Sequence, residues 1–349
     1  MTTSGIPGEP LHTRCLAVAF TMGEGTSIEF RADILDLRKS GLMALAGRIA
    51  SAGIIHKMEL RGAFSAETDR LERIESSQSH VMHEANASTR GECCRDPMVR
   101  LPELVGTPLG PGFPAELKRR FGGPLGCTHV NTLFQELSAF VARLRSVFDE
   151  RPGFLHGRAP GERIARRSLF FDAALAGDET ATRIDVHLAD VFLAERDANG
   201  SERLLAHDEA RLVTEVELAG WRLRRLEARE RCRPGPECGD LPWTSRSEDV
   251  RELCGRSLSG GVTHFCLERF GGRREDARLL SALLCLAPGM TQVGAALSDA
   301  LVPSSRARLG GLASMGPGPC YMLRAEGPLV ATLVADGITG APRDPGERP

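Results

Sequence analysis

The chain has 349 residues, of which 42% are apolar and 26% charged, and its formal net charge is −2. A single core rarely serves more than ~250–300 residues, so this length favours two domains, and the composition is that of an ordinary globular protein. The small net charge and the scattered arginines exclude an electrostatic argument for binding nucleic acid or an anionic membrane surface.

The N-terminal sequence "MTTSGIPGEP" lacks the charged segment and apolar run of a secretory signal. No stretch reaches ~18 consecutive apolar residues, so the sequence predicts no membrane span. We therefore expect a cytoplasmic protein whose ten cysteines stay reduced. Such cysteines serve as core residues, metal ligands or reactive thiols rather than as a disulfide framework.

In chain order, the first elements predicted are four strands. Their alternating apolar and polar residues are separated by turns that contain glycine, a pattern that favours an antiparallel sheet. The predicted strands cover residues 16–22, 28–37, 54–60 and 70–76.

Helices are predicted to follow the strands, near residues 101–105, over 114–121 and over 128–148. Pro114 suits a first helical turn, where its missing N–H costs nothing, and Gly122 suits a helix end. Apolar residues recur every three or four positions along the last helix, which gives it a face for the core. Strands followed by helices predict an α+β fold with the helices packed on one face of the sheet.

The second half of the chain repeats this plan. Residues 105–137 and 254–286 share a Gly-x-x-Leu motif, a central Gly and the block Arg-Phe-Gly-Gly at a constant separation. Two earlier pairs of segments keep the same order, which predicts a tandem duplication. These pairs are 27–39 with 182–196 and 56–76 with 207–229, and the Pro/Gly-rich segment 149–163 lies between the copies.

We therefore expect two related α+β domains, at residues 10–150 and 160–305, each a small antiparallel sheet followed by helices. The remaining residues, 306–349, belong to neither copy. There the sequence predicts a hairpin about Gly327-Pro328 and a disordered tail that ends in "APRDPGERP".

Several motifs of the first copy keep the order found in a known family. They are "LHTR" at 11–14, "IIHKMEL" at 54–60, a Cys near 94, "LVGTPLGPGF" at 104–113 and "GGPLGCTHVNTL" at 122–133. With these motifs the first copy resembles the bacterial family of domains of unknown function 2889, over roughly residues 10–145. The second copy resembles it weakly over 163–300. The family's usual Ile-His-Asp-Met is Ile-His-Lys-Met here, and the family label implies no activity.

The order of strands, Cys, helices and a Cys/His pair is also similar to that of the U-type iron–sulfur cluster scaffold proteins. This resemblance places His56 at the first ligand loop, Cys94 or Cys93 at the second cysteine, and Cys127 with His129 at the adjacent His-Cys pair. The chain departs from that pattern because its first ligand is His rather than Cys and its pair has the inverted order.

The pair Cys127 and His129 also stands out from the residues alone. A Cys at a helix N-terminus meets the positive end of the helix dipole and unpaired N–H groups, which lower the pKa of its thiol. His129, in the first turn, would share a metal with Cys127 or act as its base. In the structural alternative, Cys127 is a small buried apolar residue and Thr128 is the N-cap.

With His56 and either Cys93 or Cys94, this pair makes a His2Cys2 set that suits zinc and also iron. His56 is otherwise an ordinary surface or hydrogen-bonded histidine. The function expected is a metal-binding or thiol-dependent site, scaffold-like or accessory to a partner protein.

Two alternatives remain for the whole chain. One is a non-catalytic interaction protein in which both copies pack and dimerise. The other is a hydrolytic or transfer enzyme with Cys127 as nucleophile, although residues two apart on a helix rarely face each other. The second copy aligns Asp276-Ala277-Arg278 with the Cys-Thr-His of the first. We therefore expect at most one active site, in the first copy.

Overall fold

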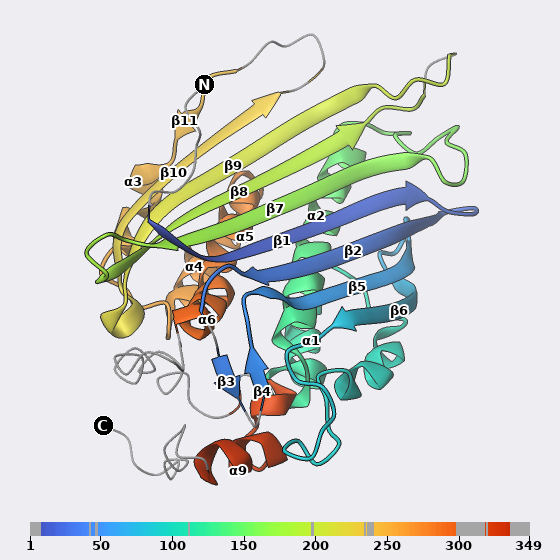
Figure 1. Cartoon of the computed structure of the whole chain (residues 1–349). Coiled ribbons are helices and arrows are strands. Elements are labelled where there is room, and N and C mark those ends of the chain that lie inside the picture. Colours follow the sequence, from blue (N-terminus) through green and yellow to red (C-terminus); the bar gives the residue numbers. More distant parts are fainter. Residues whose placement is uncertain are drawn as a thin grey trace.

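A computed structural model describes residues 8–41, 43–45, 48–110, 112–196, 199–233, 235, 241–297, 318 and 320–335. In this part of the chain, nine strands form one antiparallel sheet in the order β11-β10-β9-β8-β7-β1-β2-β5-β6, and the helices lie on one of its faces (Figure 1). The strands of the sheet are β1 (Glu9–Met22), β2 (Ser27–Arg38), β5 (Gly53–Ser65), β6 (Leu71–His80), β7 (Arg163–Leu175), β8 (Ala181–Leu193), β9 (Leu204–Glu217), β10 (Leu223–Arg233) and β11 (Thr244–Ser245), and β3 (Met43–Leu45) pairs with β4 (Arg48–Ala50) separately.

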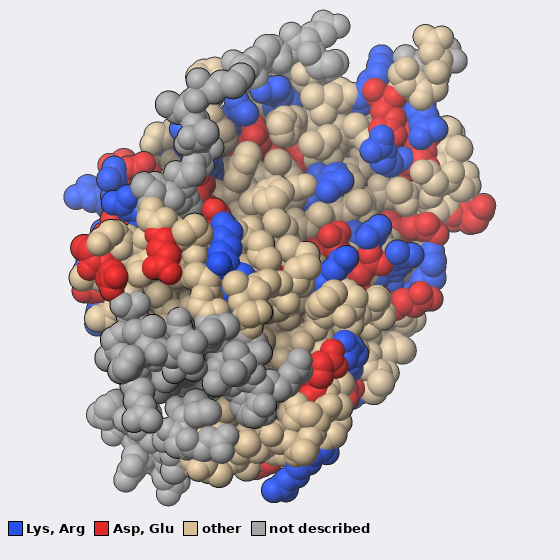
Figure 2. Space-filling view, in the orientation of Figure 1, with Lys and Arg blue, Asp and Glu red and all other residues tan. Residues whose placement is uncertain are grey.

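The four strands predicted in the first half are confirmed as β1, β2, β5 and β6, each longer than its apolar pattern indicated. Along β1 and β2, every second side chain is buried against the helices, as the alternation requires. The opposite face is open, and Figure 2 shows a broad area without charged side chains over the middle of the sheet. Phe170 on β7 contributes to this open face and is 51% exposed.

The predicted helices of the first half are confirmed as well. Pro114 occupies the first turn of α1, and that helix ends before Gly122. The described helices are η1 (Asp96–Leu104), α1 (Phe113–Phe121), η2 (Gly123–Leu125), α2 (Thr128–Glu150), η3 (Ala219–Trp221), α3 (Ser247–Val250), η4 (Arg251–Leu253), α4 (Val262–Phe270), η5 (Arg274–Asp276), α5 (Ala277–Leu284), α6 (Leu286–Leu297), η6 (Tyr321–Leu323) and α9 (Pro328–Ala335).

Two helical segments cross beneath the middle of the sheet. Helix α2 packs on β1, β2 and β5 and also contacts α5, whereas α5 packs on β8 and β9 and α6 on β1 and β7. The second segment, Arg274–Leu297, has the length and apolar composition of a membrane-crossing helix, and 61% of its most apolar window is buried inside the molecule. A buried core helix meets the same criteria of length and composition.

The four strands of the first half and the five of the second join through one central pair, β1 with β7. In this pair Leu16 lies opposite Leu169, while Arg14 lies opposite Phe171 and Val18 opposite Arg167. This pairing joins the strands of both halves into a single sheet, and the α+β prediction is confirmed.

The hairpin predicted about Gly327-Pro328 is wrong. Residues 328–335 form helix α9, whose first residue is Pro328. Proline suits this position because it needs no N–H there and its φ is already helical. Leu329 and Leu333, one turn apart, are buried against the core, so tertiary packing selects the helix for an apolar sequence that also suits a strand. The predicted tail from residue 336 onward lies outside the described residues.

Candidate functional site

A buried polar cluster lies where β1 begins, β2 ends and β5 begins, on the face covered by helices. His12 and Arg14 of β1, Asp36 of β2 and His56 of β5 contribute their side chains from this face, and each is at most 4% exposed. The strand register aligns them, since Arg14 is paired with Asp36 and Asp36 with His56. His129, in the first turn of α2, approaches from the helical layer.

Asp36 is the centre of this cluster because four donor atoms converge on its carboxylate. Arg14 forms a fork, with Nε donating to Oδ1 at 2.8 Å and one terminal nitrogen donating to Oδ2 at 3.0 Å. His12 Nε2 lies 3.0 Å from Oδ1 and His129 Nε2 lies 2.9 Å from Oδ2. Burial alone would raise the pKa of Asp36, but Arg14 and the two imidazoles hold it well below its usual range.

The two nitrogens of His129 face different partners. Nε2 faces Asp36, and Nδ1 lies 3.7 Å from the sulfur of Cys127. Cys127 is the N-cap of α2 and Thr128 is its first helical residue, so the alternative with Thr128 as the N-cap is wrong. The extended backbone of Cys127 (φ −117°, ψ 126°) lets its side chain meet His129, although the two residues are only two apart.

Charge in this group is balanced between Cys127 and His129. Burial opposes ionisation of both, but contact with Asp36 and Cys127 raises the pKa of His129 to about 9. Burial likewise opposes the thiolate of Cys127, but His129 and the backbone N–H groups of His129 and Val130 lower the pKa of the thiol below its usual value. Contact between the two residues therefore favours a thiolate beside an imidazolium, with Asp36 on the other side of the imidazole ring.

His56 stacks on His129, with ring centroids 3.7 Å apart. The backbone N–H of Met82 donates to His56 Nε2 at 3.4 Å, and His56 Nδ1 is buried with no hydrogen-bond partner among the described atoms. Burial, and then the charge of His129, keep the pKa of His56 well below its usual value. His56 is thus neutral, and with Nε2 as acceptor its unpaired Nδ1 carries the proton.

Within the part of the chain that is described, one group has the geometry of a metal site. Asp36, His56 and His129 each place one ligand atom within 4.8 Å of the others. The group shares His56 and His129 with the predicted His2Cys2 set, and Asp36 takes the place of the two thiols. Carboxylate and imidazole suit Zn²⁺, and also Fe²⁺ or Mn²⁺.

The predicted cysteine ligands lie at different distances from this centre. Cys127 touches His129, and Cys94 is buried close enough for Cys127 to affect the pKa of its thiol, which burial raises well above the usual value. The sulfur of Cys93 instead lies 3.2 Å from Asp96 Oδ1, in the loop before η1. The four-residue His2Cys2 set stays a prediction, and Cys93 is the member whose contacts lie outside the cluster.

Sequence reasoning missed three members of the cluster, namely His12, Arg14 and Asp36. A signal for them was present. Side chains two residues apart on a strand lie on the same face of the sheet. His12 and Arg14 therefore lie on the same face of β1 as the apolar residues Leu16 and Val18, and that face is the buried one. Asp36 follows Ile34 in the same way on β2. Charged residues at apolar positions of two adjacent strands predict a buried, paired site.

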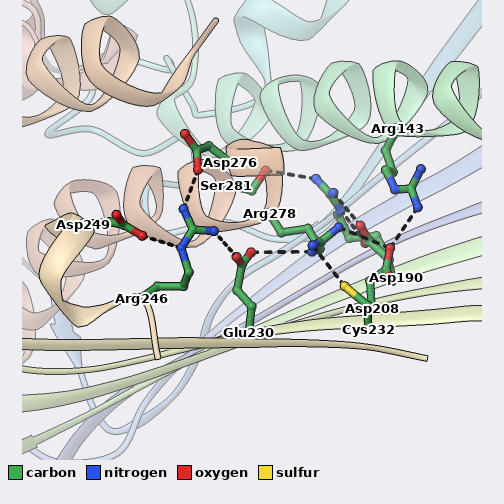
Figure 3. Close-up of polar contacts among 11 residues, drawn as sticks. Arg143, Asp190, Asp208, Glu230, Cys232, Arg246, Asp249, Asp276, Arg278 and Ser281 are labelled. Atoms are coloured by element: carbon green, nitrogen blue, oxygen red, sulfur yellow. Dashed lines mark hydrogen bonds and ion pairs between the residues drawn. The ribbon is translucent and has the colours of Figure 1, made fainter. Parts of the chain in front are cut away.

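The second half carries a matching cluster in which ion pairs replace the histidines (Figure 3). Arg167 pairs with Asp190 in register and binds it through two nitrogens, as Arg14 binds Asp36. Asp190 in turn is paired with Asp208, so Asp208 occupies the place of His56. The predicted match of segment 56–76 with 207–229 places His207 opposite His56, one residue away from the pairing in the sheet.

Arginines neutralise the carboxylates of the second cluster. Arg278, in the first turn of α5, contacts Asp208 at 3.3 Å, and Arg143 of α2 contacts the same carboxylate at 3.0 Å. Asp276, aligned with Cys127, is fully buried and paired with Arg246 (Figure 3). No thiol or imidazole stands at the positions equivalent to Cys127 and His129, and the thiol of this cluster, Cys232, instead accepts from Arg278 at 3.2 Å (Figure 3).

Comparison with known proteins leaves the function open. No curated protein and no solved structure matches the chain. The residues of the buried cluster in the first half, from His12 to His129, all lie within a segment that matches a family model. Residues 12–143 match the family described as a protein of unknown function (DUF2889).

Proposed function

We propose that the first half carries a thiol-dependent site in which Cys127 acts as a nucleophilic thiolate toward a small electrophile. The observation that supports this most is the line of contacts from the Cys127 sulfur through His129 to Asp36, at 3.7 and 2.9 Å. It joins a nucleophile at a helix N-terminus, an imidazole and a carboxylate that orients the ring. The weakness noted for residues two apart on a helix does not apply, because Cys127 precedes the helix.

Each member then has one role. Cys127 attacks, and the imidazolium of His129 stabilises the thiolate and donates a proton to the leaving group. Asp36 fixes the ring and balances its charge, and Arg14 in turn holds Asp36. His56 Nδ1 is an unused buried donor next to this group, available to an oxygen atom of the electrophile. Because Cys127 is only 6% exposed, the electrophile must be small.

Alkylation kinetics test this proposal. The rate at which iodoacetamide modifies Cys127 should exceed that of an ordinary thiol at pH 7 and should stay high to well below the usual thiol pKa. Mass spectrometry of peptides assigns the modified cysteine, and His129→Gln should remove the advantage. Arg278→Gln, at the equivalent place in the second half, is the matched control. A Cys127 that reacts no faster than a free thiol would refute the site.

A second candidate is a divalent metal held by Asp36, His56 and His129, and their convergence within 4.8 Å favours it. It ranks lower because Asp36 already receives four donors and Met82 N–H occupies Nε2 of His56. The group contains no thiolate, and thiolates are the main ligands of iron–sulfur clusters, so the candidate is a single ion. Titration with Zn²⁺ should show one equivalent bound in the parent and none in His56→Ala.

We also propose that the chain arose by tandem duplication and that the second site became structural. The matching register of Arg14 with Asp36 and Arg167 with Asp190 supports this, as does the common position of His129 and Arg278 in a first helical turn. The thiol function is then confined to the first half. Under this proposal, substitutions in the second cluster change stability and leave the reactivity of Cys127 intact.

A further inference from the structure

A second cysteine is held against the loop that carries Cys127. The backbone N–H of Tyr321 donates to the carbonyl oxygen of Gly126 at 2.8 Å. Tyr321 follows Cys320 and Gly126 precedes Cys127, so this hydrogen bond joins the peptide group after Cys320 to the peptide group before Cys127. Standard bond lengths then place their Cα atoms within about 8 Å of each other. Disulfides span roughly 4.4–6.8 Å between Cα atoms, so little backbone movement is needed to join the two.

The segment that carries Cys320 is fixed to the first half. Arg324 forms an ion pair with Glu92, and the hydroxyl of Thr332 donates to the carbonyl of Ser88 at 2.9 Å. Leu329 of α9 is buried in the core. Cys320 itself packs against the core, so its position beside Gly126 is set by several independent contacts.

The two thiols differ in ionisation. Burial raises the pKa of Cys320 to about 11, whereas the pKa of Cys127 is lowered through His129 and the helix N-terminus. The two sulfurs thus lie in different surroundings, because Cys127 is the N-cap of α2 with His129 Nδ1 3.7 Å from its sulfur, whereas Cys320 packs against the apolar core. Oxidation-sensitive cysteines have this character, with a thiolate poised next to a resolving thiol.

We propose that Cys127 reduces small hydroperoxides and that Cys320 resolves the product as an intramolecular disulfide. This inference rests on the proposed thiol function and names its substrate class. A hydroperoxide is an electrophile small enough for a thiol that is 6% exposed. One of its oxygens could also accept from the unpaired Nδ1 of His56, whose ring lies against that of His129.

The chemistry balances in two steps. The Cys127 sulfur attacks one peroxide oxygen, an S–O bond forms, the O–O bond breaks, and the leaving alkoxide or hydroxide takes a proton from His129. The sulfur loses two electrons to the peroxide and becomes a sulfenic acid. The Cys320 thiol then attacks that sulfur, an S–S bond forms, the S–O bond breaks, and the hydroxide leaves as water with the thiol proton. An external dithiol reductant restores both thiols.

Peptide mapping after oxidation tests the proposal on the full reduced chain. One equivalent of hydrogen peroxide should produce a disulfide between Cys127 and Cys320, detected without reductant. In Cys320→Ser the disulfide should vanish, and dimedone should trap at least about tenfold more sulfenic acid at Cys127. Cys320→Ala should behave identically, which guards against a local effect of serine. Cys94→Ser is the matched control and should keep the disulfide.

Two results would overturn the inference in different ways. A disulfide from Cys127 to Cys94, or a sulfenic acid that persists in the parent, would exclude Cys320 as the resolving thiol and leave the reactive thiolate standing. A Cys127 that resists both hydrogen peroxide and iodoacetamide would refute the proposed thiol function together with the inference.

Discussion

The buried clusters of the two halves occupy matching positions under one sheet and differ in how their charge is balanced. In the first half Asp36 is shared by one arginine and two imidazoles, and a thiol lies behind His129. In the second half Asp190 pairs with Arg167, and further arginines neutralise the remaining carboxylates. Guanidinium groups stay charged at all relevant pH values, so permanent charges balance Asp190 in the second cluster, whereas two titratable imidazoles help to balance Asp36 in the first.

This difference shows which features belong to the scaffold and which to the chemistry. In both halves an arginine of one strand forms a two-nitrogen ion pair with an aspartate of the neighbouring strand. In both halves the first turn of a helix also contributes a side chain to the cluster, His129 in the first and Arg278 in the second. The two clusters differ at the start of the helix, where the first half has Cys127 and His129 and the second has Asp276 and Arg278. The second half therefore serves as an internal control for the first.

The largest expected effect comes from the two central aspartates. Asp36→Asn should cost about 3–5 kcal/mol of unfolding free energy, since Arg14 loses its charged partner in a buried site. Asp190→Asn should cost clearly less, because Glu136 still contacts Arg167 at 3.0 Å. Urea unfolding of both variants measures the difference. Equal losses would show that the two clusters are balanced in the same way after all.

The next largest effect separates chemistry from packing. His129→Gln should slow alkylation of Cys127 at pH 7 on the order of 100-fold, because the thiol loses its main source of ionisation. Arg278→Gln removes the equivalent side chain of the second half and should leave the rate within about twofold. Similar slowing in both variants would mean that the substitutions change the reactivity of Cys127 by disturbing the fold, and that direct contact with His129 is not the cause.

A smaller effect concerns the dependence of stability on pH. The raised pKa of His129, about 9 against 6.5, gives stability that is present below pH 6.5 and lost as pH rises through about 9. The lowered pKa of Cys127, against 9.0, gives stability that is present above pH 9 and lost as pH falls through the folded value. The two contributions have opposite slopes, so they partly cancel over the pH range in which both groups titrate.

Replacing Cys127 by serine removes the opposing contribution of the thiol. The free energy of unfolding of Cys127→Ser should therefore fall more steeply than that of the parent as pH rises from 6.5 toward 9. Urea unfolding across this window measures both profiles. Cys232→Ser, an exposed thiol beside Arg278, should keep the parental profile. An equally steep fall in the parent would argue against a thiolate paired with an imidazolium.

The smallest expected effect concerns Lys57. Lys57 is exposed on the open face of β5, whereas its neighbour His56 faces the buried cluster. Lys57→Asp should change stability by no more than about 0.5 kcal/mol and leave the alkylation rate of Cys127 unchanged. A change in that rate would show that the open face and the cluster are coupled.

The sequence alone predicted the four first strands, helix α2 and the α+β class, because period and parity are local properties of the chain. It also placed Cys127 and His129 at a helix start, where a few adjacent residues define the geometry. Short-range patterns could not decide whether residues 328–335 form a strand or a helix, since Leu329 and Leu333 suit both until the core surface they meet is known.

Only the tertiary structure decided the partners of that pair. Asp36 reaches His129 through the register of β2 and the crossing of α2, and the fold brings in Cys320 from nearly 200 residues away. The merging of both halves into one sheet likewise depends on the pairing of β1 with β7. Distances across strands and between layers are set by the packing of the whole core, and no window of the sequence contains them.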